Sequence, residues 1–317
     1  MERILLAGVT GFIGRPLVRA LAASDRRLLV LTRRPEAAPP EWADLVGLEL
    51  VSWDGRSLGP WVQAVSGCRA VINLSGASIA SGRWTRARKA ELWESRVRST
   101  EALVRAICDS PEPPALLLNA SATGYYGSRP EPVTEASGPG EGFLAELARA
   151  WEAAAEPVRS RGVRLVLARI GVVFGAGGGM LARLLPLYRL GLGGRLGSGR
   201  QPIAWIHRED AVRALLFALE RPDLEGPYNV VAPQTLTQAE LSRLLARLLG
   251  RPDLWRVPTW LLELALGRER AQELLLGGAP VLPQRLAELG FRWRYPDPET
   301  ALMAILEQAG LHASAAA

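Results

Sequence analysis

Short apolar runs alternate with amphipathic stretches along the first two thirds of the chain, and this pattern predicts strands that alternate with helices. The runs that predict buried strands are Arg3–Ala7, Leu28–Leu31, Leu48–Val51, Ala70–Leu74, Ala115–Ala120, Val163–Arg169 and Tyr228–Val231. The stretches that predict helices are Phe12–Ala23, Thr85–Cys108, Gly142–Arg161 and Arg208–Glu220. Such alternation forms a parallel sheet covered on both faces. The predicted fold class is therefore α/β, a doubly wound parallel sheet of Rossmann type.

The pattern loosens after Arg169. Two glycine-rich connections, Gly171–Gly179 and Gly191–Gly199, flank a predicted helix at Met180–Leu190. From Thr237 onward the chain is mostly helical in pattern and is divided into short pieces by prolines. We therefore predict a Rossmann-type domain at 1–232 and a smaller, mostly helical C-terminal domain at 233–312. Residues 175–205 are expected to contribute to a cleft, and 313–317 to form a disordered tail.

A glycine-rich turn lies between the first predicted strand and the first predicted helix. Gly8 permits the tight turn, Gly11 lets the backbone approach a diphosphate, and Gly14 lets the helix pack close to the strand. The amino end of the helix then offers free N–H groups to the phosphates. This context predicts a dinucleotide site, whose cofactor-binding residues are Gly8, Thr10, Gly11, Phe12, Ile13 and Gly14.

The end of the second predicted strand indicates which dinucleotide binds. Binders of NAD usually place a carboxylate there, whereas this chain has Thr32, Arg33 and Arg34. A guanidinium can bind a 2′-phosphate through two hydrogen bonds. We therefore predict NADP as the cofactor; the alternative for the two arginines is a solvated surface pair.

With these residues the chain resembles the extended short-chain dehydrogenase/reductases, and most of all an atypical branch of epimerase-family, sugar-nucleotide-epimerase-like proteins. The resemblance runs essentially from end to end. Its motifs are the opening Gly-x-x-Gly-Phe-Ile-Gly, Asn73–Gly76, Arg83–Thr85, Ser95-Arg96, Tyr125–Gly127, Trp151–Ala154, Arg169–Gly179 and Trp205–His207. The C-terminal part, from Val257-Pro258 to Tyr295-Pro296, resembles a small domain of unknown function that accompanies this branch.

The resemblance implies further NADP contacts. Thr32 and Arg33 would hold the adenosine phosphate, and Leu74 and Ser75 would line the ribose on the nicotinamide side. Glu91 and Arg96 are further cofactor positions that the resemblance implies. Their alternative is an exposed charge pair on one long helix.

The catalytic residues of the extended relatives are only partly present. Those relatives carry a Ser or Thr after the fifth strand and then Tyr-x-x-x-Lys, in which lysine lowers the pKa of the tyrosine and holds the ribose. Ser121 fits the first position, but Leu147 and Trp151 occupy the tyrosine and lysine positions. Because Lys89 is the only lysine, the chain contains no Tyr-x-x-x-Lys.

The candidate catalytic residues are therefore Ser121, Tyr125 and Tyr126. The alternative for both tyrosines is packing with a satisfied hydroxyl group. His207 either faces a cleft or makes a structural hydrogen bond to the backbone. The predicted function is that of an NADP-dependent oxidoreductase or epimerase-like enzyme on an unidentified small molecule. The alternative is a non-catalytic NADPH-binding sensor or scaffold.

Composition excludes several other classes of function. The net charge is only +6 and the basic residues are scattered, so we expect no nucleic-acid partner. The apolar runs are far too short for a membrane span, and no signal peptide is recognised, so we expect a cytoplasmic protein without a membrane partner. His207 and His312 are the only histidines and no cysteine pair has ligand spacing, so no metal site is expected. A homodimer is left open.

Overall fold

The computed structural model describes residues 2–24 and 26–311, so the predicted tail at 313–317 lies outside the described residues. The chain divides into two compact units. The first, here the sheet unit, comprises Met1–Ser121, Leu147–Arg169 and Val212–Pro227. The second unit comprises Ala122–Glu146, Ile170–Ala211 and Tyr228–Ala317. The domain bounds drawn from the sequence at 1–232 and 233–312 stay a prediction.

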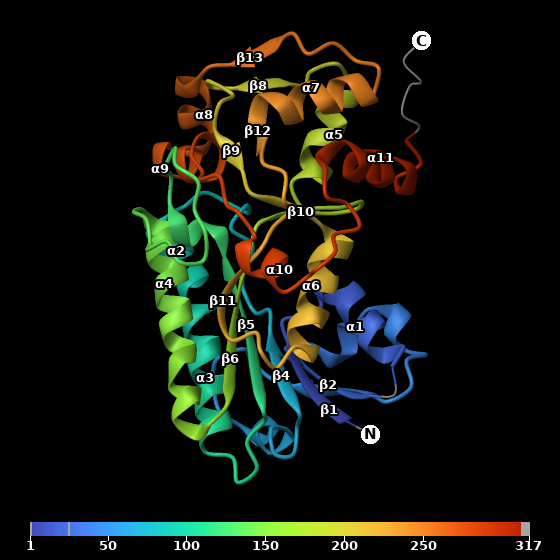
Figure 1. The fold of residues 1–317 in the computed structure, drawn as a ribbon, viewed down its shortest axis with the longest axis vertical. Helices are drawn as coiled ribbons and strands as arrows, with labels where there is room; N and C mark the ends of the chain where they lie inside the picture. The colour runs from blue at the N-terminus through green and yellow to red at the C-terminus, as the bar shows by residue number, and fades with distance from the viewer. Residues whose placement is uncertain (1, 25, 312–317) are drawn as a thin grey trace. The chain divides into compact units, whose positions relative to one another are not determined.

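A seven-stranded sheet runs in the order β11-β6-β5-β4-β1-β2-β3 (Figure 1). Its strands are β1 (Glu2–Ala7), β2 (Arg26–Thr32), β3 (Leu48–Ser52), β4 (Ala70–Asn73), β5 (Leu116–Ala122), β6 (Arg164–Ile170) and β11 (Gly226–Val230). The neighbouring pairs from β3 through β2, β1 and β4 to β5 are parallel. The predicted doubly wound α/β fold is confirmed. The strand order reverses between β1 and β4, and open α/β sheets bind ligands at such a switch point.

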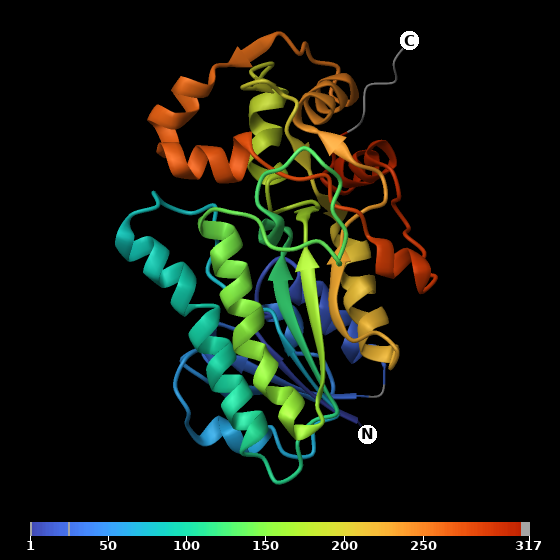
Figure 2. The ribbon, with the colours of Figure 1, turned by 60° about the vertical axis from the view of Figure 1, so that its left-hand side comes forward.

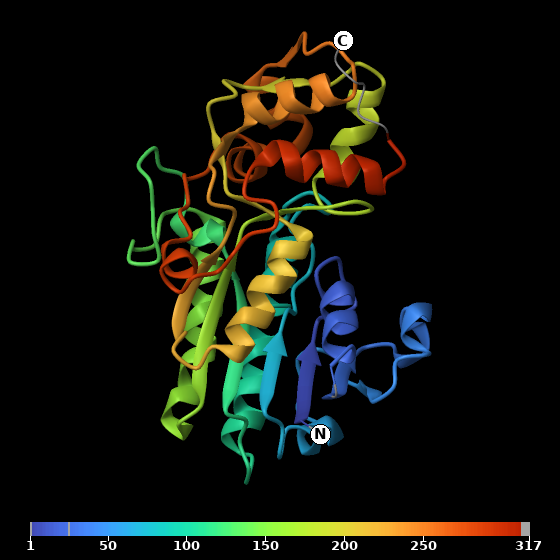
Figure 3. The same ribbon diagram turned by 45° about the vertical axis from the view of Figure 1, so that its right-hand side comes forward.

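Helices cover both faces of this sheet. They are α1 (Gly14–Ala22), α2 (Arg86–Glu94), α3 (Val97–Cys108), α4 (Phe143–Ala155) and α6 (Arg208–Glu220). Figure 2 shows α3 and α4 side by side along one face, and Figure 3 shows α1 and α6 on the other. The apolar sides of the strands and of α3 form one continuous core, with Leu5, Val71, Leu103, Leu117 and Leu165 among its buried members. Shorter 3-10 turns lie at Pro35–Ala37, Pro40–Trp42, Pro60–Ala64, Thr123–Tyr126 and Glu156–Arg161.

Two predicted helices differ from the observed ones. The helix expected over Thr85–Cys108 is interrupted at Ser95 and Arg96, between α2 and α3. A contact with a residue distant in the sequence accounts for this interruption. The Ser95 hydroxyl accepts a hydrogen bond from the Ala77 N–H at 2.9 Å. The helix expected over Gly142–Arg161 is α-helical only to Ala155 and continues as a 3-10 turn that contains Pro157.

The second unit combines helices with small sheets. Its helices are α5 (Leu181–Arg189), α7 (Gln238–Leu248), α8 (Thr259–Leu266), α9 (Arg268–Ala271), α10 (Gln284–Glu288) and α11 (Pro298–Gln308), with one π-helical turn at Gln272–Leu276. Its short strands are β7 (Val172–Phe174), β8 (Gly194–Leu196), β9 (Pro202–Ile203), β10 (Trp205–His207), β12 (Leu236–Thr237) and β13 (Trp255–Val257). These strands form three two-stranded sheets, β10–β7, β12–β9 and β13–β8.

The glycine-rich connections of the second unit therefore contain strands, which corrects the loops predicted at Gly171–Gly179 and Gly191–Gly199. A Cβ atom on Gly171 would lie 2.6 Å from the carbonyl oxygen of Ala204, and one on Gly194 would lie 2.2 Å from that of Trp255. Glycine is needed at both positions because the backbone of the partner strand approaches so closely. In the part of the chain that the structure describes, no helix is long and apolar enough to cross a membrane.

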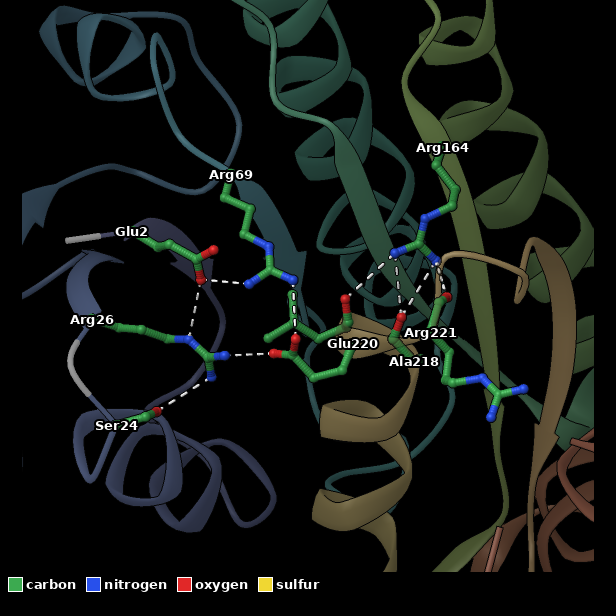
Figure 4. Close-up of polar contacts among 9 residues, drawn as sticks. Glu2, Ser24, Arg26, Arg69, Arg164, Ala218, Glu220 and Arg221 are labelled. Atoms are coloured by element: carbon green, nitrogen blue, oxygen red, sulfur yellow. Dashed lines mark hydrogen bonds and ion pairs between the residues drawn. The ribbon is translucent and has the colours of Figure 1, made fainter. Parts of the chain in front are cut away.

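The amino ends of the central strands are joined by a ring of four charged side chains, which we call the ion-pair ring (Figure 4). Its members are Glu2 of β1, Arg26 of β2, Arg69 before β4 and Glu220 at the end of α6. Each glutamate contacts both arginines, and Arg69 reaches Glu220 at 3.0 Å. Beside the ring, the Arg164 guanidinium donates to backbone carbonyl oxygens at the end of α6, among them that of Arg221 at 3.0 Å. The ring ties three strands and one helix together at one edge.

Candidate functional site

The glycine turn follows β1 at the switch point of the sheet. Gly8 has φ +72°, and a Cβ atom there would lie 2.4 Å from the backbone nitrogen of Ser75. A Cβ atom on Gly14 would lie 2.2 Å from Cα of Val9. A Cβ atom on Gly11, in contrast, would have no heavy atom within 4 Å. The chain's own backbone therefore fills the space at two of the three glycines, and the third faces open space.

The predicted cofactor residues of two neighbouring strands lie on either side of this turn. Ala7 at the end of β1 pairs with Leu31 of β2 and with Asn73 of β4. Thr32 to Arg34 therefore leave the sheet on one side of the glycine turn, and Leu74 and Ser75 leave it on the other. Arg33 and Arg34 are exposed, and no ion pair of either side chain occurs within the described residues. The predicted cofactor residues that follow β1, β2 and β4 therefore lie next to one another at this edge of the sheet.

A buried polar network anchors the turn after β4. The Asn73 side chain donates to Thr100 Oγ1 at 2.9 Å and to Asn119 Oδ1 at 2.7 Å, and it accepts from the Ser75 N–H at 3.0 Å. Thr100 also accepts from the Trp151 indole N–H at 3.0 Å. All of these side chains except that of Ser75 are buried. The network fixes the backbone of Leu74 and Ser75 against α3 and α4.

The interruption between α2 and α3 separates the two predicted positions on this segment. Glu91 lies on α2, is exposed and pairs with Arg88 at 2.5 Å. Arg96 is half-buried and donates to the carbonyl oxygens of Leu92 at 3.2 Å and Ala77 at 3.0 Å. The alternative of an exposed Glu91–Arg96 pair on one helix is therefore wrong.

Ser121 lies at the end of β5 in a buried ion-pair cluster. Its hydroxyl donates to Glu152 Oε1 at 2.6 Å. The Arg169 guanidinium donates to both carboxylate oxygens of Glu152, at 2.8 Å each. All three residues are buried, so the negative charge of Glu152 is compensated by Arg169. The Ser121 proton points at a carboxylate, which leaves the hydroxyl oxygen as an acceptor.

The two candidate tyrosines follow β5 and belong to the second unit. Tyr126 is fully buried, and its hydroxyl donates to Asn229 Oδ1 at 2.7 Å. Tyr125 is half-buried, and its ring meets that of Tyr126 edge to face at 5.4 Å. Tyr126 is therefore a packed side chain with a satisfied hydroxyl group, which is the alternative to a catalytic role, whereas Tyr125 keeps part of its surface exposed.

His207 is also buried in the second unit. Its Nδ1 accepts from the Glu209 N–H at 3.2 Å, and its ring lies 4.0 Å from that of Tyr295. Burial lowers the pKa of His207 to about 4. The structural hydrogen bond is thus the role that the geometry gives to His207. Within residues 2–24 and 26–311, no three or more His, Cys, Asp or Glu side chains gather as metal ligands would.

Sequence reasoning missed the polar side chains behind the site. Asn73, Thr100, Asn119 and Glu152 are buried within the sheet unit and were not selected as site residues. A signal was available at Asn73 alone, which ends an apolar run, because a buried polar side chain in a parallel sheet needs partners on neighbouring strands. Thr100 and Glu152 lie within α3 and α4, where the sequence pattern does not mark them.

Comparison with known proteins shows the family. A sequence model of the NAD dependent epimerase/dehydratase family matches residues 4–231, and one of a domain of unknown function, DUF1731, matches 257–305. The chain belongs to the NAD dependent epimerase/dehydratase family. It is 41% identical over 293 residues to an epimerase family protein of Mycobacterium bovis, covering 92% of this chain and 93% of the relative. It is 34% identical to the human epimerase family protein SDR39U1, covering 96% and 99%.

Solved structures agree with this membership. The crystal structure of human SDR39U1 (isoform 2) with NADPH superimposes with a TM-score of 0.86 at 33% identity, covering 96% of this chain and 99% of that one. A UDP-glucuronic acid 4-epimerase from Bacillus cereus has a TM-score of 0.80 at 14% identity, covering 98% and 99%, and shows the fold alone.

Proposed function

We propose that this protein binds NADP(H) at the glycine turn and is an oxidoreductase or epimerase-like enzyme on a small molecule, working without Tyr-x-x-x-Lys. The observation that carries the proposal is the open space at Gly11, between two glycines whose surroundings are filled by backbone. A diphosphate needs such a cradle, because it meets backbone N–H groups at the amino end of α1. The NADPH bound to human SDR39U1 supports the same cofactor here.

The exposed arginines after β2 support NADP over NAD. Neither Arg33 nor Arg34 is neutralised by a carboxylate among the described residues, so both are available to a 2′-phosphate. A charge-assisted bond of this kind contributes on the order of 1.5–3 kcal/mol. The preference for NADPH is therefore expected to be at least about tenfold at low salt.

Calorimetric titration tests this preference. Arg33→Ala should weaken NADPH binding far more than NADH binding. Arg27→Ala is the matched control, because Arg27 lies at the opposite end of β2 and pairs with Glu49 at 2.9 Å. Equal affinities of the wild-type protein for NADPH and NADH would show that the arginines do not bind the 2′-phosphate.

Bound cofactor would supply or accept a hydride, and the chain's own residues would position the substrate and move its proton. Ser121, with its proton on Glu152, offers an acceptor oxygen, and Tyr125 offers a half-exposed phenol group. A sensor or scaffold without turnover is the second candidate. The observation in its favour is that the hydroxyl protons of Ser121 and Tyr126 are both engaged in buried bonds.

Oxidation of NADPH in the presence of a panel of carbonyl compounds separates the two candidates. An enzyme should give turnover with at least one compound, and Tyr125→Phe should lower it by about 10²–10⁴ if the phenol supplies the proton. Turnover that is unchanged in Tyr125→Phe removes the phenol from the mechanism. No turnover with any compound, together with tight NADPH binding, favours the sensor.

A further inference from the structure

Large apolar side chains are exposed together in the second unit, at a place that we call the apolar corner. Its members follow α5 or lie at the start of β13, and they are Leu190, Leu192, Leu254 and Trp255. Each of them is between 52% and 78% exposed. The Trp255 indole N–H donates at 3.0 Å to the carbonyl oxygen of Gly191, which separates the two leucines after α5. The four side chains therefore form one contiguous patch, and such patches mark interaction surfaces.

Helix α8 adds to this exposed apolar surface. Figures 1 and 2 both show α8 continuing from β13. Among its eight residues Glu263 is the only charged one, and none of the eight is buried. Trp260 and Leu264 lie one turn apart and are 64% and 70% exposed. A helix that is apolar on nearly all sides is ordinarily covered by a protein core or by lipid.

The charge around the apolar corner is positive and unbalanced. Segments 187–195 and 251–268 carry two carboxylates and five arginines, which are Arg189, Arg195, Arg251, Arg256 and Arg268. Asp253 accepts from the Ser242 hydroxyl at 2.6 Å, and Glu263 accepts from the side-chain amide of a glutamine at 2.7 Å. Among the residues that the structure describes, none of the five arginines forms an ion pair.

Strand β13 is the outer edge of its two-stranded sheet. The Gln238 side chain of α7 accepts from the Leu196 N–H at 2.9 Å and donates to the Gly194 carbonyl oxygen at 3.3 Å, so α7 backs the partner strand β8. Successive side chains of a strand leave opposite faces, and both Trp255 and Arg256 are exposed. The edge therefore presents an apolar ring and a cation next to each other.

Two of the arginines lie side by side in this sheet. The register of β13 and β8 places Arg256 beside Arg195, so both side chains leave the same face. Like charges at facing positions destabilise a sheet. The Nε atom of Arg195 is buried and has no hydrogen-bond partner in the described part of the chain. Two guanidinium groups without a counter-charge favour a ligand with several anionic oxygen atoms, such as phosphate groups.

Charge indicates which partner fits this surface. A second copy related by a two-fold axis would bring the same patch to itself, so Arg256 and its neighbours would face their own counterparts. An anionic lipid bilayer instead presents negatively charged headgroups above an apolar interior. Tryptophan is enriched at this boundary, and arginine extends its guanidinium to the headgroups while its stem stays in apolar surroundings.

We propose that the apolar corner and α8 attach this protein to the surface of an anionic lipid bilayer. The leucines and tryptophans enter the boundary of the acyl chains, and the arginines bind headgroup phosphates. This inference goes beyond the proposed function and does not depend on the cofactor. The expectation of no membrane partner was based on the lack of a span or a signal peptide, and it does not bear on attachment to a bilayer surface.

Sedimentation with lipid vesicles tests the proposal. The full chain is mixed with vesicles of phosphatidylcholine alone, or with vesicles in which about a third of the lipid is phosphatidylserine. The double variant Leu190→Asn/Leu254→Asn removes two exposed apolar side chains, and Arg256→Gln removes one charge. The matched controls are Val46→Asn and Arg98→Gln, which change an exposed apolar residue and an exposed arginine of the sheet unit.

The expected result is charge-dependent binding. The wild-type protein should bind the phosphatidylserine vesicles at least about tenfold more tightly than phosphatidylcholine alone at low salt, and salt should weaken this binding. Arg256→Gln should weaken it by about fivefold and the leucine double variant by at least about tenfold. Both controls should bind as wild type does. Urea unfolding midpoints should be unchanged in all variants, because the substituted side chains are exposed.

Other outcomes overturn the inference. These are sedimentation with neither kind of vesicle, equal sedimentation with both, or equal binding by the leucine double variant and Val46→Asn. A wild-type dimer that becomes a monomer in the leucine double variant, measured by analytical ultracentrifugation, would show that a second copy covers the corner instead. Binding of an acidic amphipathic peptide without any binding of vesicles would assign the surface to a protein partner.

Discussion

Three glycines within seven residues have different physical roles in this protein. Gly8 and Gly14 are required by the protein's own packing, because any Cβ atom there meets backbone at 2.4 Å and 2.2 Å. Gly11 is not required by packing, and its φ is not in the left-handed region. In the proposed function, Gly11 leaves room for the diphosphate of the cofactor.

This difference predicts opposite behaviour for two substitutions. Gly11→Val should fold with nearly the wild-type free energy of unfolding but lose NADPH binding, because the side chain fills the space of the diphosphate. Gly14→Ala should lower the free energy of unfolding by about 1–3 kcal/mol, since backbone must move to admit a methyl group. Urea unfolding and NADPH titration measure both effects. Retained NADPH binding in Gly11→Val would mean that the cofactor lies elsewhere.

His207 makes stability depend on pH. Its pKa is lowered to about 4, mainly by burial, while an unfolded histidine has a pKa of about 6.5. Between these values the unfolded chain binds a proton that the folded chain does not, so the free energy of unfolding falls as pH decreases from about 6.5 to about 4. The full effect is on the order of 3 kcal/mol.

We therefore expect urea unfolding midpoints to fall between pH 7 and pH 5 in the wild-type protein. His207→Asn should remove most of this slope while keeping an acceptor for the Glu209 N–H. The window is informative because His312 is the only other histidine. A slope that is the same in wild type and His207→Asn would place the titrating group elsewhere.

At the scale of elements, the local sequence pattern predicts whether a segment is helix or strand better than it predicts where a helix is interrupted. No residue type near Ser95 predicts a break in the helix, since neither glycine nor proline occurs there. The bend is made by the distant Ala77, whose N–H and carbonyl oxygen take partners from Ser95 and Arg96. For the same reason the strands β7 and β8 could not be predicted: each has three residues and is defined by its partner strand.

The ion-pair ring predicts a network effect on stability. Glu220→Gln should lower the free energy of unfolding by about 1 kcal/mol at low salt, because Glu220 contacts both Arg26 and Arg69. The loss should shrink in about 1 M salt, where surface charges are screened. Glu49→Gln breaks only the isolated, exposed pair with Arg27 and should change almost nothing. Equal effects of the two substitutions would show that the ring is no more than a set of separate pairs.

At the scale of the whole molecule, one physical reason allowed the sequence to predict the sheet and to select the first candidate site residues. Each strand of a parallel sheet is buried on both faces, so it appears as an apolar run, and the end of each run marks the edge at which ligands bind. Gly8, Thr32 and Leu74 were all selected in this way, and their role in binding stays a prediction. The buried network of Asn73, Thr100 and Asn119 was not, because polar partners from different strands and helices are joined only by the fold.

Membership of an epimerase family does not predict epimerase activity for this chain. The resemblance to Tyr-x-x-x-Lys relatives sets Leu147 and Trp151 at the positions of the tyrosine and the lysine. Both residues are buried, and neither can take a proton. Loss of a positioned general base lowers rates by about 10²–10⁴. We expect no interconversion of UDP-galactose and UDP-glucose at an enzymatic rate, measured by chromatography after incubation with cofactor. Turnover of about 1 s⁻¹ or more would identify a base among the remaining residues.

The ion-pair ring also affects how stability changes with temperature. The hydration of charged groups becomes less favourable as temperature rises, so the penalty for bringing four charges together falls while their mutual attraction persists. Apolar burial gains little over the same range. Apart from Lys89 the basic residues are all arginine, whose weakly hydrated guanidinium suits such a ring. The edge where β1, β2, β4 and α6 meet is thus held by contacts whose relative contribution to stability grows with temperature, while that of the apolar core changes little.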